Sequence, residues 1–131
     1  LMSKYNNLSV KITFSTPLSH KTEAGADFFL MPSRFEPCGL NQLYSMKYGT
    51  LPIVNMTGGL KDTVVDLENK EGTGFVLSPL NPENIVKAAE RAKEFYKDKE
   101  SLTEARKRAM KVDSSWKKSA EEYMEVYTSL L

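Results

Sequence analysis

"FFLMPSRFEPCGLNQLYSMKYGTLPIVNMTG", residues 28–58, is the stretch of sequence that decides the fold. Two uninterrupted apolar runs, Phe28–Met31 and Leu51–Val54, stand on either side of a segment whose apolar residues have helical spacing. Apolar runs without polar alternation are typical of strands buried on both faces of a parallel sheet. Pro32 ends the first run and Gly49 ends the helix, so the stretch predicts a strand–helix–strand unit.

Two further segments have strand character. Val10–Phe14 alternates apolar and polar residues, which predicts a half-covered strand, and Gly74–Leu77 is a third short apolar run. Helical segments separate these strands along the chain. The alternation predicts a single α/β domain over residues 1–131, Rossmann-like, with a mainly parallel sheet of about four strands and helices on both faces.

Capping residues mark where the helices begin. Pro17 opens a short helix that closes at Gly25, and Asn81 followed by Pro82 is a typical start for a longer one. Ser101 and Glu104 have the spacing of a capping box. The last predicted helix presents one face made of Trp116, Ala120, Tyr123, Tyr127 and Leu130.

Composition excludes several classes of protein. With 18 basic and 17 acidic residues, the chain has no electrostatic footprint of a nucleic-acid binder. No apolar run reaches the roughly 18 residues that span a bilayer, so we expect no membrane contact. The single cysteine, Cys38, fits a reducing compartment and predicts a cytoplasmic protein. One histidine, His20, and one cysteine do not make a structural zinc site, and we expect no metal.

The loop after Phe28–Met31 has the residues of a ligand site. Glu36 would accept hydrogen bonds from hydroxyl groups, and Gly39 would let a ligand approach the backbone. Amide groups at the helix start, at Gly39 and Leu40, would attract a phosphate or a sugar oxygen. Acidic residues are also common at helix starts because they interact favourably with the helix dipole. Glu36 is therefore either a ligand-binding residue or an ordinary acidic residue that stabilises the helix.

A second loop follows the next strand. Thr57, Gly58 and Gly59 precede another helix, although glycine pairs also mark plain turns. Ligands of open parallel sheets bind outside the carboxyl ends of the strands, so two such loops at one edge favour a binding site there. Phe14 ends the first predicted strand at that edge, where it would either stack on a flat heterocycle or join the core.

His20 and Cys38 both admit a reactive interpretation and a plain one. We expect His20 to be a structural, hydrogen-bonding residue. A helix start lowers a thiol pKa, but no histidine or second cysteine is placed to activate Cys38. We therefore interpret Cys38 as a small residue that lines a pocket.

The segments SRFEPCGL, QLY, KYGTLP and TGGLKDTV, in this order and spacing, closely resemble the C-terminal domain of bacterial- and plant-type glycogen and starch synthases. SHKTEAGAD and WKKSAEEYMEVY extend the resemblance to most of the chain. The resemblance implies the GT-B architecture and a retaining glucosyltransferase. Such an enzyme moves glucose from a nucleotide-glucose, ADP-glucose rather than UDP-glucose being expected, to the non-reducing end of an α-1,4-glucan. No other cofactor is implied, and the compartment would be the cytoplasm, or a plastid in a plant or alga.

The resemblance also implies roles for particular residues. Glu36 corresponds to the acid that holds the donor glucose and is the expected catalytic residue. The segment Cys38, Gly39 and Leu40 would contact glucose and phosphate through its backbone. Phe14 would pack on the nucleotide base, and Thr57, Gly58 and Gly59 would form the neighbouring donor loop. Tyr44 stands where related GT-B families have the second acid of an E-x7-E motif, which is usual for glycogen and starch synthases.

Other family features are not found in these 131 residues. They include a KTGGL loop with a nearby histidine, and an arginine and a lysine that clamp the phosphates in an RLxxQKG pattern. The resemblance implies that two strands of the family sheet lie between Val10–Phe14 and Phe28–Met31. We therefore expect a fragment that is inactive alone and that self-associates through an exposed sheet edge or its last helix. A non-catalytic nucleotide-sugar or glucan binding module, and another GT-B glucosyltransferase, are the alternatives.

Overall fold

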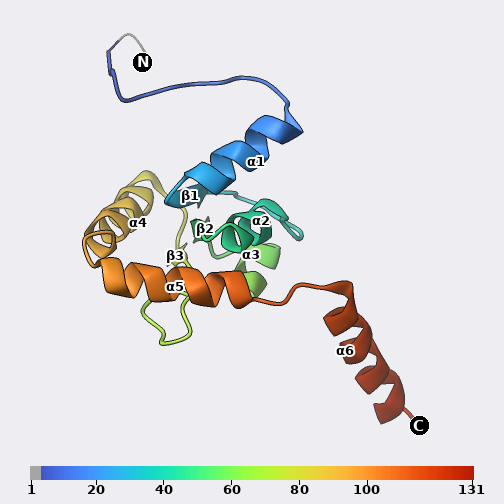
Figure 1. Cartoon of the computed structure of the whole chain (residues 1–131). Coiled ribbons are helices and arrows are strands. Elements are labelled where there is room, and N and C mark those ends of the chain that lie inside the picture. The colour runs from blue at the N-terminus through green and yellow to red at the C-terminus, as the bar shows by residue number, and fades with distance from the viewer. Residues whose placement is uncertain (1–3) are drawn as a thin grey trace.

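The computed structural model describes residues 4–131 and has a parallel sheet with helices on both faces. Strands β1 (Phe28–Met31), β2 (Leu51–Asn55) and β3 (Phe75–Leu77) pair in the order β1-β2-β3 (Figure 1). The predicted Rossmann-like α/β class is confirmed. Because all the strands are parallel, the loops that follow β1 and β2 leave the sheet at the same edge.

The central strand, β2, is buried along its whole length, as its uninterrupted apolar sequence predicts. Its residues divide between the two faces of the sheet. Leu51 and Ile53 pack toward α5 (Lys99–Lys111) and α4 (Pro82–Phe95), whereas Val54 packs against α3 (Gly58–Thr63). Strand β1 lies at the edge and is only half-buried, with Leu30 45% exposed, so the prediction of burial on both faces is wrong for this strand.

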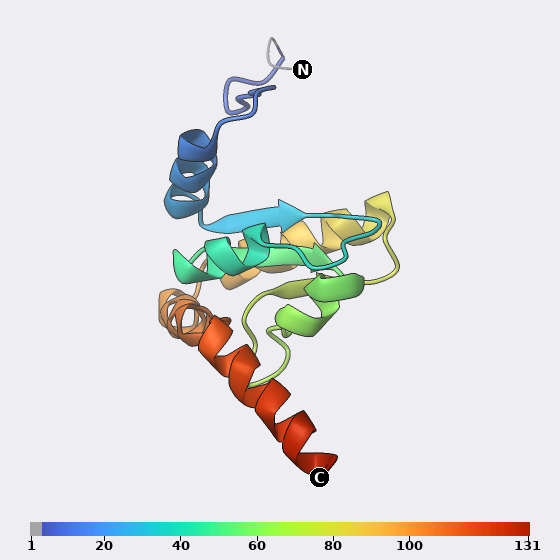
Figure 2. The same ribbon diagram turned by 90° about the vertical axis from the view of Figure 1, so that its right-hand side faces the viewer.

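Three more helices complete the structure: α1 (Thr16–Gly25), α2 (Asn41–Lys47) and α6 (Trp116–Ser129). Helix α2 is tied at its C-terminal end to α5, because the ammonium group of Lys47 donates to the carbonyl oxygens of Met110 and Val112 at 3.1 and 2.7 Å. No residue of α6 is buried, and Figure 2 shows this helix extending away from the rest of the molecule.

Most of the predicted helix starts are confirmed. Pro17 lies in the first turn of α1, and the Asn81 side chain accepts a 2.7 Å hydrogen bond from the amide of Asn84 at the start of α4. The capping box at Ser101 is wrong. Helix α5 begins three residues earlier than that box implies, and the carboxylate of Asp98 is its cap, accepting hydrogen bonds from the amide and the hydroxyl of Ser101.

The predicted strand Val10–Phe14 is also wrong. These residues are irregular, so the sheet has three strands rather than about four. Ile12 and Phe14 are 97% and 98% exposed, and the segment runs away from the sheet (Figures 1 and 2). Alternation of apolar residues makes a strand only where a neighbouring strand completes the ladder. Within the described residues β1 pairs with β2 alone, and the anticipated pairing of Val10–Phe14 with β1 does not form.

Residues 4–131 contain no helix with both the length and the apolar character that crossing a membrane requires.

Candidate functional site

Two loops meet at the carboxyl edge of the sheet. The first, residues 32–40, joins β1 to α2. The second, residues 56–59, follows β2 and includes Gly58 and Gly59, which the structure places in the first turn of α3 rather than before it. The amide of Gly59 donates a 3.0 Å hydrogen bond to the carbonyl oxygen of Glu36, so the first loop lies directly against the start of α3 (Figure 2). The sequence prediction that these two loops share one edge is confirmed.

Glycine is required where the loops touch. A Cβ atom on Gly58 would collide with the carbonyl oxygen of Glu36, and one on Gly59 would collide with that of Cys38. Gly58 also has a positive φ of 44°, which other residues rarely adopt. The close approach that these glycines allow is therefore the approach of the first loop, and Gly59 is buried beneath it.

Glu36 lies half-buried between the two loops. Its carboxylate oxygen Oε2 accepts a 3.3 Å hydrogen bond from the hydroxyl of Ser33. The carbonyl of Ser33 in turn accepts a 2.9 Å bond from the side-chain amide of Asn55, the last residue of β2. The carboxylate is thus positioned from the central strand, and its remaining lone pairs can accept from hydroxyl groups of a ligand.

The residues that follow Glu36 in the first loop are largely exposed to solvent. Cys38 is a free and exposed cysteine, and Leu40 is also exposed. Gly39 has a φ of 74°, and α2 begins at Asn41 with no side chain capping its first amides. Backbone amides at such a helix start are unpaired and carry partial positive charge. Thr57 has the same place before α3, where it also provides no side-chain cap.

Gln42 is a site residue that sequence reasoning missed. The apolar spacing of residues 40–48 predicted an apolar inner face for this helix, but the buried side chains of α2 are Gln42, Ser45 and Met46. Gln42 and Ser45 are fully buried although both are polar. A signal was available, since positions 42, 45, 46 and 49 also have helical spacing.

Phe14 is separate from the two loops. With Ser15, Thr16, Ser19, His20, Asn41 and Tyr44 it lines a hollow of about 230 Å³ on the α1 side of α2. None of the other predicted site residues lines this hollow. The structure brings Phe14 near Asn41, the first residue of α2, but it does not hold the exposed ring in a fixed stack.

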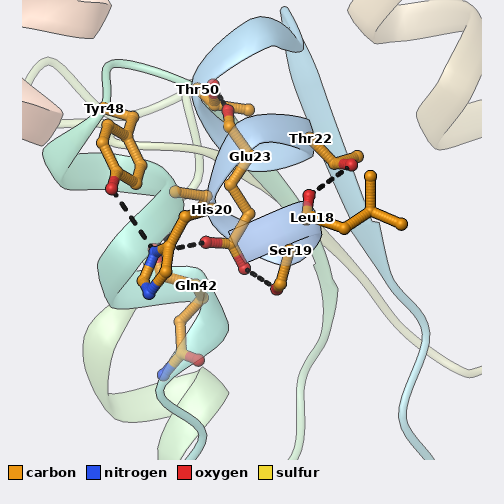
Figure 3. Close-up of polar contacts among 9 residues, drawn as sticks. Leu18, Ser19, His20, Thr22, Glu23, Gln42, Tyr48 and Thr50 are labelled. Atoms are coloured by element: carbon orange, nitrogen blue, oxygen red, sulfur yellow. Dashed lines mark hydrogen bonds and ion pairs between the residues drawn. The ribbon is translucent and has the colours of Figure 1, made fainter. Parts of the chain in front are cut away.

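His20 has the structural surroundings expected of it. Its Nδ1 atom lies 3.4 Å from the hydroxyl of Tyr48 and 3.9 Å from the Oε2 atom of Glu23 (Figure 3). Glu23 is buried between α1 and α2, with Ser19 donating to its other oxygen at 3.4 Å. Thr50 donates to the backbone carbonyl of Glu23. These contacts attach α1 to the core and leave the two loops untouched.

Within residues 4–131, no three His, Cys, Asp or Glu side chains gather in a way that would hold a metal ion.

The fold and the two loops define a parallel α/β domain with a candidate site at the carboxyl edge of its sheet. Comparison with known proteins shows which protein family has this arrangement. The family described as glycosyl transferases group 1 matches residues 3–112. The chain belongs to this family.

Within this family, the similar curated proteins are glycogen synthases. The chain is 51% identical over 129 residues to a glycogen synthase of Nitrosospira multiformis, covering 95% of this chain and 26% of that protein. It is 46% identical over 126 residues to a glycogen synthase of Kosmotoga olearia, again covering 95% and 26%. The chain therefore spans about a quarter of the length of the curated relatives it matches.

A solved structure has the same fold. The catalytic domain of starch synthase IV from Arabidopsis thaliana, bound to ADP and acarbose, matches with a TM-score of 0.80 and 36% identity. The match covers 90% of this chain and 25% of that one. The resemblance to glycogen and starch synthases is thereby confirmed.

Proposed function

We propose that this chain forms the donor-binding part of a retaining glycogen or starch synthase. The complete enzyme transfers glucose from a nucleotide-glucose, ADP-glucose rather than UDP-glucose, to the non-reducing end of an α-1,4-glucan. The observation that carries the proposal is the contact between the two loops, which presents the Glu36 carboxylate on the same loop as the exposed residues Cys38 and Leu40. Membership of the glycosyl transferase family supports it.

Each predicted residue has a chemical task in this proposal. Glu36 accepts hydrogen bonds from the hydroxyl groups of the donor glucose and holds the ring during transfer. The backbone of Cys38, Gly39 and Leu40 contacts the glucose and the phosphate through unpaired amides. Thr57, Gly58 and Gly59 hold this backbone from below, and Phe14 packs on the base of the nucleotide.

Donor binding is tested by calorimetric titration of ADP, UDP and ADP-glucose into the 131-residue chain. We expect ADP-glucose to bind more tightly than ADP, because the sugar adds the Glu36 contacts, and ADP more tightly than UDP. Equal affinities for ADP and ADP-glucose would remove the sugar site from the proposal. Binding of none of the three would leave this part of the chain without the donor role.

The role of Glu36 is tested with Glu36→Gln, which keeps the shape but removes the charge. We expect the variant to lose the advantage of ADP-glucose over ADP while the affinity for ADP stays unchanged. Glu68→Gln is the control, since Glu68 is an exposed acid away from the two loops. For turnover, the chain can replace the matching segment of the Nitrosospira multiformis glycogen synthase. There Glu36→Gln should lower kcat by about 100-fold or more, as does the loss of one group that stabilises a transition state.

We also propose that the exposed edge of β1 or the apolar face of α6 mediates self-association of this chain. Trp116, Tyr123 and Tyr127 are exposed on a helix without buried residues, and a patch of this kind favours association. A reducing compartment, the cytoplasm or a plastid, suits the free and exposed Cys38.

A further inference from the structure

We infer that Gln42 is a positioning residue that holds the two loops in one fixed arrangement and turns the backbone amides of the first loop outward. The inference rests on the proposed donor site. Gln42 does not reach that site itself, since its side chain is fully buried behind the loops. It acts through the backbone of Cys38 and Gly39 on one side and through Thr63 on the other.

The side-chain nitrogen of Gln42 links the first loop to Thr63, the last residue of α3, and through Thr63 to Gly59. Nε2 lies 3.2 Å from the carbonyl oxygen of Cys38 and 2.9 Å from that of Gly39, both in the first loop. It also donates to the hydroxyl oxygen of Thr63 at 3.1 Å. That hydroxyl donates its own proton to the carbonyl of Gly59 at 2.6 Å. A continuous chain of hydrogen bonds therefore links Cys38 to Gly59.

These bonds decide which way the first loop faces. In a planar trans peptide, the C=O of one residue and the N–H of the next point in opposite directions. Because Gln42 holds the carbonyls of Cys38 and Gly39 inward, the amides of Gly39 and Leu40 point away from it. Neither amide donates a hydrogen bond anywhere in residues 4–131. The loop thus offers two free donors, which is what an anionic or hydroxylated ligand requires.

Gly39 is adapted to the same side chain. A Cβ atom there would lie 2.5 Å from Oε1 of Gln42, and the φ of 74° at Gly39 is one that residues other than glycine rarely adopt. Oε1 is buried without a donor, whereas Nε2 has three oxygen neighbours. The amide cannot be turned over, because its oxygen would then face two carbonyl oxygens. The contacts therefore favour one orientation of the Gln42 amide group, the one that holds both carbonyls of the first loop inward.

The inference is tested on the ¹⁵N-labelled 131-residue chain by amide hydrogen exchange and by calorimetry with ADP-glucose. The amide of Gly59, which bonds to Glu36 across the two loops, reports their contact, and the amide of Ile53 in β2 reports the core. In Gln42→Met, which keeps the volume but cannot donate, we expect exchange at Gly59 relative to Ile53 to rise about tenfold or more. A buried acceptor left without its donor has an effect of this order. The Kd for ADP-glucose should rise by about the same factor.

Three further variants separate positioning from general stability. Ser45→Ala is the control, because the hydroxyl of Ser45 is buried on the same helix and bonds only to the carbonyl of Gln42. It should move exchange at Gly59 and Ile53 together. Thr63→Val removes the link to Gly59 and should repeat the effect of Gln42→Met, whereas Thr63→Ser keeps the hydroxyl and should restore the parent behaviour. If Gln42→Met does not fold, the two Thr63 variants decide.

The outcomes are distinct. An unchanged ratio of Gly59 to Ile53 exchange in both Gln42→Met and Thr63→Val would overturn the inference. A changed ratio with unchanged affinity for ADP-glucose would overturn it too, since the loop arrangement would then not matter for the donor. If the parent chain does not bind ADP-glucose, the proposed function fails, and the exchange ratio alone decides whether Gln42 holds the loops together.

Discussion

The two loops at the carboxyl edge and the final helix, α6, are built in opposite ways. The loops are small, rich in glycine, and joined through backbone and buried side-chain hydrogen bonds such as those of Gly59 and Gln42. Helix α6 carries large aromatic side chains, among them Trp116 at 89% exposure, and buries none of its residues. The loops are held together by hydrogen bonds within this chain and leave the amides of Gly39 and Leu40 free for a ligand, whereas α6 presents an apolar face that the described residues leave uncovered.

This difference indicates which substitutions should affect the stability of the fold and which should affect association. Backbone packed against backbone cannot rearrange to accept extra atoms, so the loops should respond strongly to one methyl group. An exposed helix face tolerates substitution in stability, but its apolar patch governs association. Two predictions test this contrast, and a third, at Asp66 outside both regions, gives an effect of intermediate size for comparison.

The largest effect on stability is expected from Gly59→Ala. The added methyl group would meet the carbonyl of Cys38, which cannot move without breaking the contact between the loops. We expect a loss of about 3 kcal/mol in the free energy of unfolding, the upper end of overpacking effects. Urea unfolding followed by circular dichroism measures it.

Gly25→Ala is the matched control for Gly59→Ala. Gly25 is the last residue of α1, and a Cβ atom there has no neighbour within 4 Å. Alanine favours a helix over glycine, so this variant should be neutral or more stable by up to about 1 kcal/mol. Equal losses at Gly25 and Gly59 would contradict the contrast drawn above.

An intermediate effect is expected at Asp66, which lies in neither region. Partial burial raises the pKa of Asp66, but hydrogen bonds from the Arg91 guanidinium and from the amides of Glu68 and Val76 outweigh burial and hold the pKa below its usual value. A lowered carboxyl pKa stabilises the fold above the unfolded-state pKa of about 4, and this contribution is lost as the pH falls through the folded-state pKa.

Asp66→Asn should therefore cost about 1 kcal/mol at pH 7, since the ion pair with Arg91 at 2.6 Å is partly exposed to solvent. The difference between variant and parent should shrink as the pH falls below about 4. Unfolding midpoints measured between pH 2.5 and 7 give the comparison. A gap that stays constant over this range would show that charge is not the cause.

The smallest effect on stability is expected on α6. Tyr123→Ser combined with Tyr127→Ser removes two exposed aromatic rings and should change the free energy of unfolding by less than about 0.5 kcal/mol. The same double variant should weaken self-association in sedimentation velocity over a range of concentrations. Association that persists at the parent level would instead direct attention to the edge of β1.

Much of the fold could be predicted from the sequence because its signals are local. The uninterrupted apolar run of β2 and the cap at Asn81 are each read from a few adjacent residues. The prediction of a strand at Val10–Phe14 was wrong because a strand needs a neighbouring strand to pair with, and the alternation of residues within the segment does not show whether one is present. The predicted start of α5 was wrong because Asp98, three residues before Ser101, caps the helix through the amides of Glu100 and Ser101, so Ser101 already lies inside the first turn.

The candidate site also has parts that local sequence signals predicted and a part that they missed. The motif around Glu36 and the glycine pair indicated two loops, and the parallel topology implied their shared edge. Gln42 was missed because hydrophobic periodicity assigns a buried helix face to apolar residues. In α2 the buried face meets carbonyl groups of a loop, and a polar side chain is what can satisfy them.

The tie between Lys47 and the end of α5 has a mechanical consequence. Helix α2 has seven residues and is therefore about 10 Å long. One end is fastened to the first loop by Gln42 and the other to the carbonyls of Met110 and Val112. A helix this short does not bend appreciably, so the Glu36 loop and the segment that leads into α6 are attached to opposite ends of one rigid element.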